Sequence, residues 1–230
     1  MTRKTNARLA GFAFLFDIAT GIASLVMFNQ ATGGGEGFAK LKSIAQSPTT
    51  MRLTVLLTLC GFVSAVVLGV TLYALTRDED RDLALLALCC RVTEGVIAAV
   101  AAIGGLQLLA VATAATGAVA GDASAAHALG ALLMQQRGST GSIAALCFVM
   151  GSTIFSYLFL RARSVPAPLA WLGVLASVLL LVALPLELGG FIRVTFPMWL
   201  PMLVFEVTFA LWLIIKGVAA PRTITQGVNP

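Results

Sequence analysis

Residues 83–94 read Leu-Ala-Leu-Leu-Ala-Leu-Cys-Cys-Arg-Val-Thr-Glu, and apolar and small residues continue this stretch to Ala115. The stretch is long enough to cross a membrane, yet it contains Arg91 and Glu94. Residues three or four apart share one face of a helix. Small residues let other helices approach closely, and the pattern therefore predicts a membrane helix whose face with the two charges is packed by other helices. The small residues of this face are Ala84, Ala87, Ala98, Ala101 and Gly105.

The composition indicates an all-α polytopic membrane protein with residues 1–230 in a single membrane domain. Of the 230 residues, 59% are hydrophobic and 11% are charged, with a mean hydropathy of +0.96. A soluble domain carries about 25% charged residues, so this chain has too few polar residues to cover a soluble core. The net charge of +5 comes with no basic run interleaved with aromatic residues, and nucleic-acid binding is not expected.

Six apolar stretches predict a bundle of six transmembrane helices, at residues 9–28, 53–76, 83–115, 142–160, 169–188 and 197–215. The first follows a basic head, as a signal peptide would. It is longer than the apolar part of a signal, and Asp17 interrupts it, so a helix that stays in the membrane is favoured. Loops are expected at 29–52 and 116–140, with short helices at 38–45 and 124–136, the second capped by Ser124.

The third stretch is unusually long, and the charges between stretches indicate an orientation. Residues 83–115 would span ~50 Å as a helix, more than the ~30 Å hydrocarbon core, so this helix must tilt, kink near Gly104-Gly105 or project. Of the 15 Lys and Arg residues, nine lie on the side of the termini, five on the other side, and Arg91 lies within a helix. Positive residues favour the cytoplasmic side, which predicts cytoplasmic termini and a multi-pass protein whose partner is the lipid bilayer.

Four ionisable residues are predicted to share one layer near the middle of the bilayer. Asp17 and Arg91 each lie about 8 residues from the cytoplasmic end of their helix, and Glu94 and Glu206 lie about 11 residues from theirs. At 1.5 Å per residue these depths are ~12 and ~16.5 Å. We expect Arg91 to lie within ~4 Å of Asp17 or Glu206, the distance that defines an ion pair.

This predicted polar cluster of Asp17, Arg91, Glu94 and Glu206 has several interpretations. In the structural interpretation, Arg91 pairs with an acid and fixes the packing of the helices. Alternatively, its long side chain extends so that the guanidinium lies among the lipid headgroups. In the binding interpretation, the cluster has three acids and only one arginine, so at least one carboxyl group has no internal cation. Such a carboxyl can bind a proton or a small polar or cationic solute, as in transporters. A partner-binding or sensory membrane protein is a further alternative.

An enzyme is the less favoured interpretation. Glu94 and Glu206 would serve as an acid/base pair, but no nucleophile motif accompanies them, and no catalytic residue is assigned. No cofactor or metal site is predicted. His127 is the only histidine, which excludes bis-histidine haem and multi-histidine metal sites within one chain. The four cysteines lie in apolar stretches without metal-ligand spacing and are interpreted as buried free thiols.

Several short motifs occur in an order that resembles a known family. Arg8-Leu-Ala-Gly11 opens the first stretch, Leu72-Tyr-Ala-Leu75 closes the second, Arg91-Val-Thr-Glu94 lies in the third, Tyr157-Leu-Phe-Leu-Arg161 closes the fourth, and Glu206 precedes Leu211-Trp-Leu-Ile-Ile-Lys-Gly217. From Arg8 to Gly217 the chain resembles the bacterial membrane proteins grouped as domain of unknown function 4386. The resemblance implies six helices and a bacterial cytoplasmic membrane, and it implies no established activity.

The chain departs from this family before the fourth stretch. Family members often carry an adjacent His/Asp pair there, whereas His127 is followed by Ala128. A site built on that pair is therefore not expected in this protein.

Overall fold

The computed structural model describes residues 2–33, 38–116 and 120–219, and within these ranges the chain is built from helices without strands. This confirms the predicted all-α fold. The helices are α1 (Arg3–Thr32), α2 (Phe38–Gln46), α3 (Pro48–Thr76), α4 (Arg81–Ala115), α5 (Ala120–Arg161), α6 (Ala167–Leu188) and α7 (Phe196–Ile215). All except α2 are long and apolar enough to cross a membrane.

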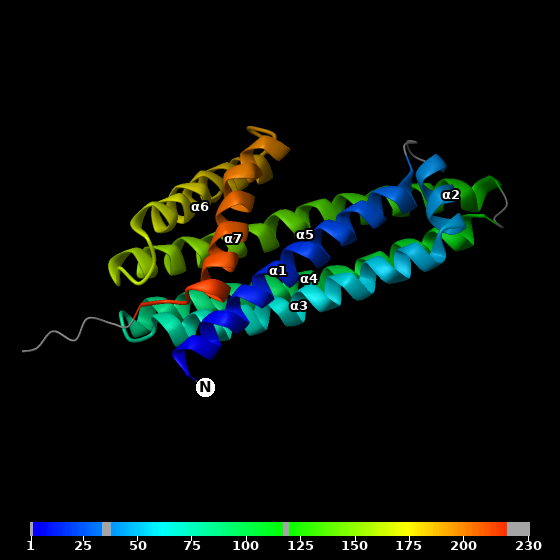
Figure 1. Cartoon of the computed structure of the whole chain (residues 1–230). Helices are drawn as coiled ribbons and strands as arrows, with labels where there is room; N and C mark the ends of the chain where they lie inside the picture. Colours follow the sequence, from blue (N-terminus) through cyan, green and yellow to red (C-terminus); the bar gives the residue numbers. More distant parts are fainter. Residues whose placement is uncertain (1, 34–37, 117–119, 220–230) are drawn as a thin grey trace, which may run out of the picture.

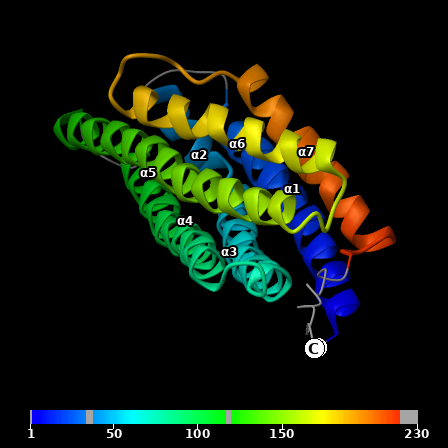
Figure 2. The same ribbon diagram turned by 90° about the vertical axis from the view of Figure 1, so that its left-hand side faces the viewer.

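The six long helices form a closed ring of packed neighbours (Figures 1 and 2). Going round, α1 packs on α3, α3 on α4, α4 on α5, α5 on α6, α6 on α7, and α7 returns to α1. Side chains from all six helices meet inside this ring in one large apolar core. The backbones of α1 and α4 are not neighbours, so only side chains reach from one to the other across the interior.

A smaller core lies at the far end from the N-terminus, and we call it the distal core. It joins the end of α1, the short helix α2, the start of α3 and the end of α4, and α5 packs against it. In Figure 1, α4 and α5 extend past the ends of α6 and α7 to reach it. The extra length of α4 is therefore used for packing. The buried members are Ala31, Leu41, Ile44, Met51, Leu108, Leu109 and Ala112.

The predicted loop at residues 116–140 is wrong from Ala120 onward, although the short helix predicted within it at 124–136 is helical as part of α5. From Ala120 the chain is helical and continuous with the fourth span, so Ser124 lies inside α5 and caps nothing. The segment is rich in alanine and glycine, but a helical glycine costs only ~1 kcal/mol relative to alanine. Packing of Leu133 and Met134 against the distal core offsets that cost. The short helix predicted at residues 38–45 is confirmed as α2.

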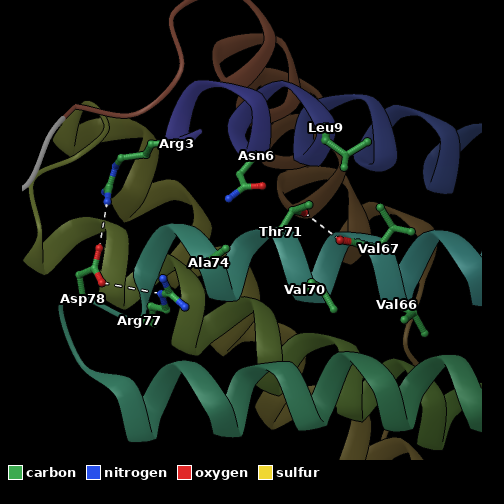
Figure 3. A pocket seen from close by; sticks show the side chains of 10 residues that line it. All are labelled: Arg3, Asn6, Leu9, Val66, Val67, Val70, Thr71, Ala74, Arg77 and Asp78. Carbon is green, nitrogen blue, oxygen red and sulfur yellow. Dashed lines mark hydrogen bonds and ion pairs between the residues drawn. The ribbon is translucent and has the colours of Figure 1, made fainter. Parts of the chain in front are cut away.

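Ion pairs join the turns at the end of the bundle near the N-terminus. Arg3 Nη1 lies 3.6 Å from Asp78 Oδ2 (Figure 3), and Arg161 Nε lies 3.0 Å from Glu79 Oε1. Asp80 accepts a hydrogen bond from the backbone N–H of Leu83 and so caps α4. A carboxylate at this position also suits the positive end of the helix dipole.

The cysteines only partly match their interpretation as buried residues. All four thiols are free, and Cys90 is buried, but Cys60 and Cys89 lie exposed on the outside of the bundle. A cysteine behaves as a small hydrophobe, so an outer face in contact with lipid accommodates it as well as a core does.

Candidate functional site: an ionic cluster between α1 and α4

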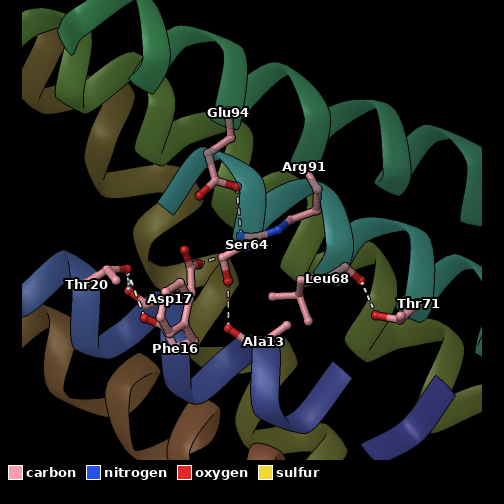
Figure 4. A network of polar contacts seen from close by, with 9 residues as sticks. All are labelled: Ala13, Phe16, Asp17, Thr20, Ser64, Leu68, Thr71, Arg91 and Glu94. Carbon is pink, nitrogen blue, oxygen red and sulfur yellow. Dashed lines mark hydrogen bonds and ion pairs between the residues drawn. The ribbon is translucent and has the colours of Figure 1, made fainter. Parts of the chain in front are cut away.

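Arg91 lies at the centre of the site and is 1% exposed. Its Nη2 donates a hydrogen bond to Asp17 Oδ2 at 3.2 Å, and its Nη1 lies 2.8 Å from Glu94 Oε2 (Figure 4). The second pair is an ionic contact whose geometry is not that of a hydrogen bond, and Arg91 Nε has no hydrogen-bond partner in the described ranges. The expected contact of Arg91 with Asp17 within ~4 Å is present, and it bridges α4 to α1.

Close approach of the neighbouring helices encloses the Arg91 side chain. A Cβ atom at Gly69 of α3 would lie 3.0 Å from Arg91 Cβ, and one at Gly151 of α5 would lie 3.4 Å from Arg91 Cδ. Arg91 Cζ also lies 5.0 Å from the centre of the Phe148 ring, within the range of a cation–π interaction. Glycines on two sides thus let α3 and α5 pack directly against the arginine.

A hydroxyl fixes the spacing of α1 and α3 beside the cluster. Ser64 Oγ of α3 donates a hydrogen bond to the Ala13 carbonyl oxygen at 2.8 Å, four residues before Asp17 (Figure 4). Both groups are buried, and a buried hydrogen bond of this kind is costly to break without replacement. Asp17 is therefore presented to Arg91 from a helix that is itself held in place.

Glu206 of α7 is close to the cluster without joining it. The residue is half-buried and lies near enough to Arg91 and Asp17 to interact with both electrostatically. Within the described ranges it has no ion pair shorter than 4 Å. The structure thus brings Asp17, Arg91 and Glu94 into direct contact and leaves Glu206 as a nearby third acid.

A cavity of about 180 Å³ adjoins the cluster between α1, α3 and α4. Asp17 and Glu94 line it, together with the hydroxyl side chains of Thr20, Ser24 and Thr58. Thr20 Oγ1 donates to the Phe16 carbonyl oxygen and Thr58 Oγ1 to the Thr54 carbonyl oxygen, each at 2.9 Å. A hydroxyl that donates in this way keeps lone pairs for accepting. The polar groups of the cavity are therefore mainly hydrogen-bond acceptors.

The sequence reasoning did not predict that Thr20 and Thr58 line the site. A signal for Thr20 existed, because it follows Asp17 by three residues and so lies on the same face of α1. Thr58 carried no such signal, since its place depends on how α3 is rotated against α1. Within the described ranges, no group of three or more His, Cys, Asp or Glu side chains is placed to hold a metal ion.

Six membrane-length apolar helices closed around a buried ionic cluster define a multi-pass integral membrane protein. Residues 9–217 match the model of the family described as "Domain of unknown function (DUF4386)", and the chain belongs to this family. The resemblance read from the sequence motifs is thereby confirmed. No curated protein and no solved structure matches the chain.

Proposed function

We propose that this membrane protein binds a proton or a small cationic or polar solute at the ionic cluster and moves it across the bilayer. One observation carries the proposal. Asp17 and Glu94 are both held by the buried Arg91, and both also line the cavity of about 180 Å³. The same two carboxylates are thus available to an internal cation and to a ligand.

The chemistry of the cavity favours a ligand that donates hydrogen bonds or carries positive charge. Its polar lining consists of two carboxylates and hydroxyls with free lone pairs. One arginine faces Asp17, Glu94 and the nearby Glu206, so acids outnumber the cation. A water occupies ~30 Å³ of liquid, and the cavity therefore suits a solute of a few non-hydrogen atoms.

Arg91 would act in this proposal as a counter-ion that the ligand displaces. Charged side chains at membrane depth are costly, and they mark ion and solute pathways in many membrane proteins. A proton or cation that neutralises Asp17 weakens its pair with Arg91, which is the side-chain bridge between α1 and α4. Ligand binding would then loosen one contact across the ring, as alternating access requires.

The proposal places the protein in a bacterial cytoplasmic membrane with both termini in the cytoplasm. The excess of Lys and Arg residues on the side of the termini supports this orientation. The ion pairs of Arg3 and Arg161 with the turn between α3 and α4 support it too, because they gather the charged turns at the end of the bundle that holds the N-terminus.

A second candidate function is favoured by the nearly complete burial of Arg91. A guanidinium that is 1% exposed and paired with two carboxylates also fits a purely structural clamp between helices. In that case the protein would be a non-catalytic partner-binding or sensory membrane protein. The two candidates differ in whether neutral variants of the acids stop movement of a ligand or only weaken the fold.

The test uses purified protein in liposomes with two probes, radiolabelled guanidinium as a small planar cation and an internal pH dye for protons. We expect the wild type to move at least one of them faster than protein-free liposomes. Asp17→Asn and Glu94→Gln should each lower that rate tenfold or more, with Glu206→Gln lowering it less. Glu187→Gln is the matched control, because Glu187 lies at the end of α6 away from the cluster.

The structural clamp predicts a different pattern. Liposomes with wild-type protein would then match empty ones for both probes, while Asp17→Asn and Glu94→Gln would lower the unfolding temperature. That combination would contradict transport.

A further inference from the structure

A long groove runs along the outer face of the bundle between α1 and α3. It consists of two adjoining cavities of about 620 Å³ and about 570 Å³, and Leu9 and Val67 line both. The first begins at the end of the bundle near the N-terminus, where Arg3, Arg77 and Asp78 line it (Figure 3). The second continues toward the middle of the helices. The groove is therefore charged at one end and apolar along the rest.

The charged end has an excess of positive charge. Asp78 lies 3.6 Å from Arg3 Nη1 and 3.8 Å from Arg77 Nε, so two guanidinium groups share one carboxylate. Arg3 Nε is buried and has no hydrogen-bond partner in the described ranges, and the Arg77 side chain is 57% exposed. The side chain of Asn6 lies beside them in Figure 3. The exposed Arg77 guanidinium is therefore open to a ligand, and guanidinium groups bind phosphate well.

The apolar part of the groove has exposed hydrophobic walls. Phe12, Phe16 and Val63 are 59%, 51% and 58% exposed, as suits a face that contacts the hydrocarbon core of a bilayer. From Arg3 to Phe16 the groove follows α1 for ~20 Å at 1.5 Å per residue. One leaflet contributes about half of the ~30 Å hydrocarbon core. The groove thus has the length of a phospholipid that lies with its phosphate at the charged end.

We propose that this groove binds one anionic phospholipid from the leaflet next to the N-terminus. The phosphate lies between Arg3 and Arg77, and an acyl chain follows Leu9 toward Phe16 and Val63. An anionic headgroup is preferred because a choline headgroup would bring a second positive charge to a site that is already positive. Basic pockets at the membrane surface bind anionic lipids by the same electrostatics. The site is separate from the ionic cluster and does not depend on the proposed transport function.

Native mass spectrometry of the detergent-purified full chain tests the site with phosphatidylglycerol and phosphatidylcholine as probes. We expect the wild type to bind phosphatidylglycerol more tightly. The double variant Arg3→Gln with Arg77→Gln should weaken phosphatidylglycerol binding roughly tenfold or more. Phosphatidylglycerol would then no longer bind more tightly than phosphatidylcholine. Arg8→Gln is the matched control, since Arg8 is exposed on the same helix and does not line the groove.

A second variant tests the apolar path and covers the case in which the double variant fails to fold. Ala74→Leu adds bulk between the charged end and the apolar part while keeping every charge. It should weaken binding of both lipids and leave the unfolding temperature unchanged. The proposal is overturned if Ala74→Leu binds phosphatidylglycerol as the wild type does. It is also overturned if Arg8→Gln weakens binding as much as the double variant, because the attraction would then be diffuse.

Discussion

Arg91 in α4 and Arg137 in α5 both lie well inside membrane-length helices, and their surroundings differ. Arg91 in the first half of α4 is 1% exposed and has carboxylate oxygens of Asp17 and Glu94 at 3.2 and 2.8 Å. Arg137 in α5 is half-buried beside the distal core, and its Cζ lies 4.0 Å from the centre of the Phe28 ring. Within the described ranges Arg137 has no ion pair. The enclosed Arg91 thus has acids as partners, whereas Arg137, nearer one end of the bundle, is covered by an aromatic ring.

The largest expected effect is the difference in the free energy of unfolding between variants at these two arginines. Arg91→Met leaves the half-buried Asp17 and Glu94 without their cation, and breaking a buried pair in this way costs roughly 3–5 kcal/mol. Arg137→Met strands no carboxylate and should cost about 1 kcal/mol, the scale of a cation–π contact. Chemical unfolding in detergent micelles measures both free energies.

A triple variant checks the reason for that difference. Arg91→Met combined with Asp17→Asn and Glu94→Gln removes the whole set of charges, so it should recover part of the stability lost by Arg91→Met alone. Equal losses for Arg91→Met and Arg137→Met would show that the acids contribute nothing specific, and the contrast between the two regions would fail.

The sequence predicts those features of the Arg91 region that depend only on how deep each residue lies in the membrane. The helical rise of 1.5 Å per residue placed Asp17 and Arg91 at one level, and the ion pair between them follows from that. Rotation of one helix against another is not encoded in hydropathy. The contact of Arg91 with Phe148 and the lining of the cavity by Thr58 therefore came only from the structure.

The Arg137 region was predicted less well. The segment 116–140, rich in alanine and glycine, is predicted from the sequence as a loop that contains Arg137. The structure has a continuous helix there, because contacts with α2 and α4 in the distal core stabilise a segment whose own propensity is modest. Local sequence signals do not contain such contacts between distant segments.

The next effect in size compares two glycines of α5, one in each region. A Cβ atom at Gly151 would lie 3.2 Å from the Ala87 carbonyl oxygen and 3.4 Å from Arg91 Cδ, whereas one at Gly138 would meet nothing within 4 Å. Gly151→Ala should therefore cost roughly 1–3 kcal/mol through overpacking. Gly138→Ala should stabilise the helix by up to ~1 kcal/mol. Thermal unfolding of the two variants is the measurement, and a destabilising Gly138→Ala would indicate that α5 is not helical at that position.

The smallest expected effect tests whether the ring of Phe28 replaces an acid at Arg137. A double-mutant cycle of Phe28→Leu and Arg137→Met should give a coupling free energy of about 0.5–1 kcal/mol, since the guanidinium stacks at 4.0 Å. The matched cycle uses Phe148→Leu and Arg91→Met, whose groups are 5.0 Å apart. That coupling should be smaller, because two carboxylates already satisfy the charge of Arg91. If the Arg91 cycle gives the larger value, the aromatic ring stabilises the buried arginine more than the half-buried one. The distinction between the two regions then has to be drawn from burial alone.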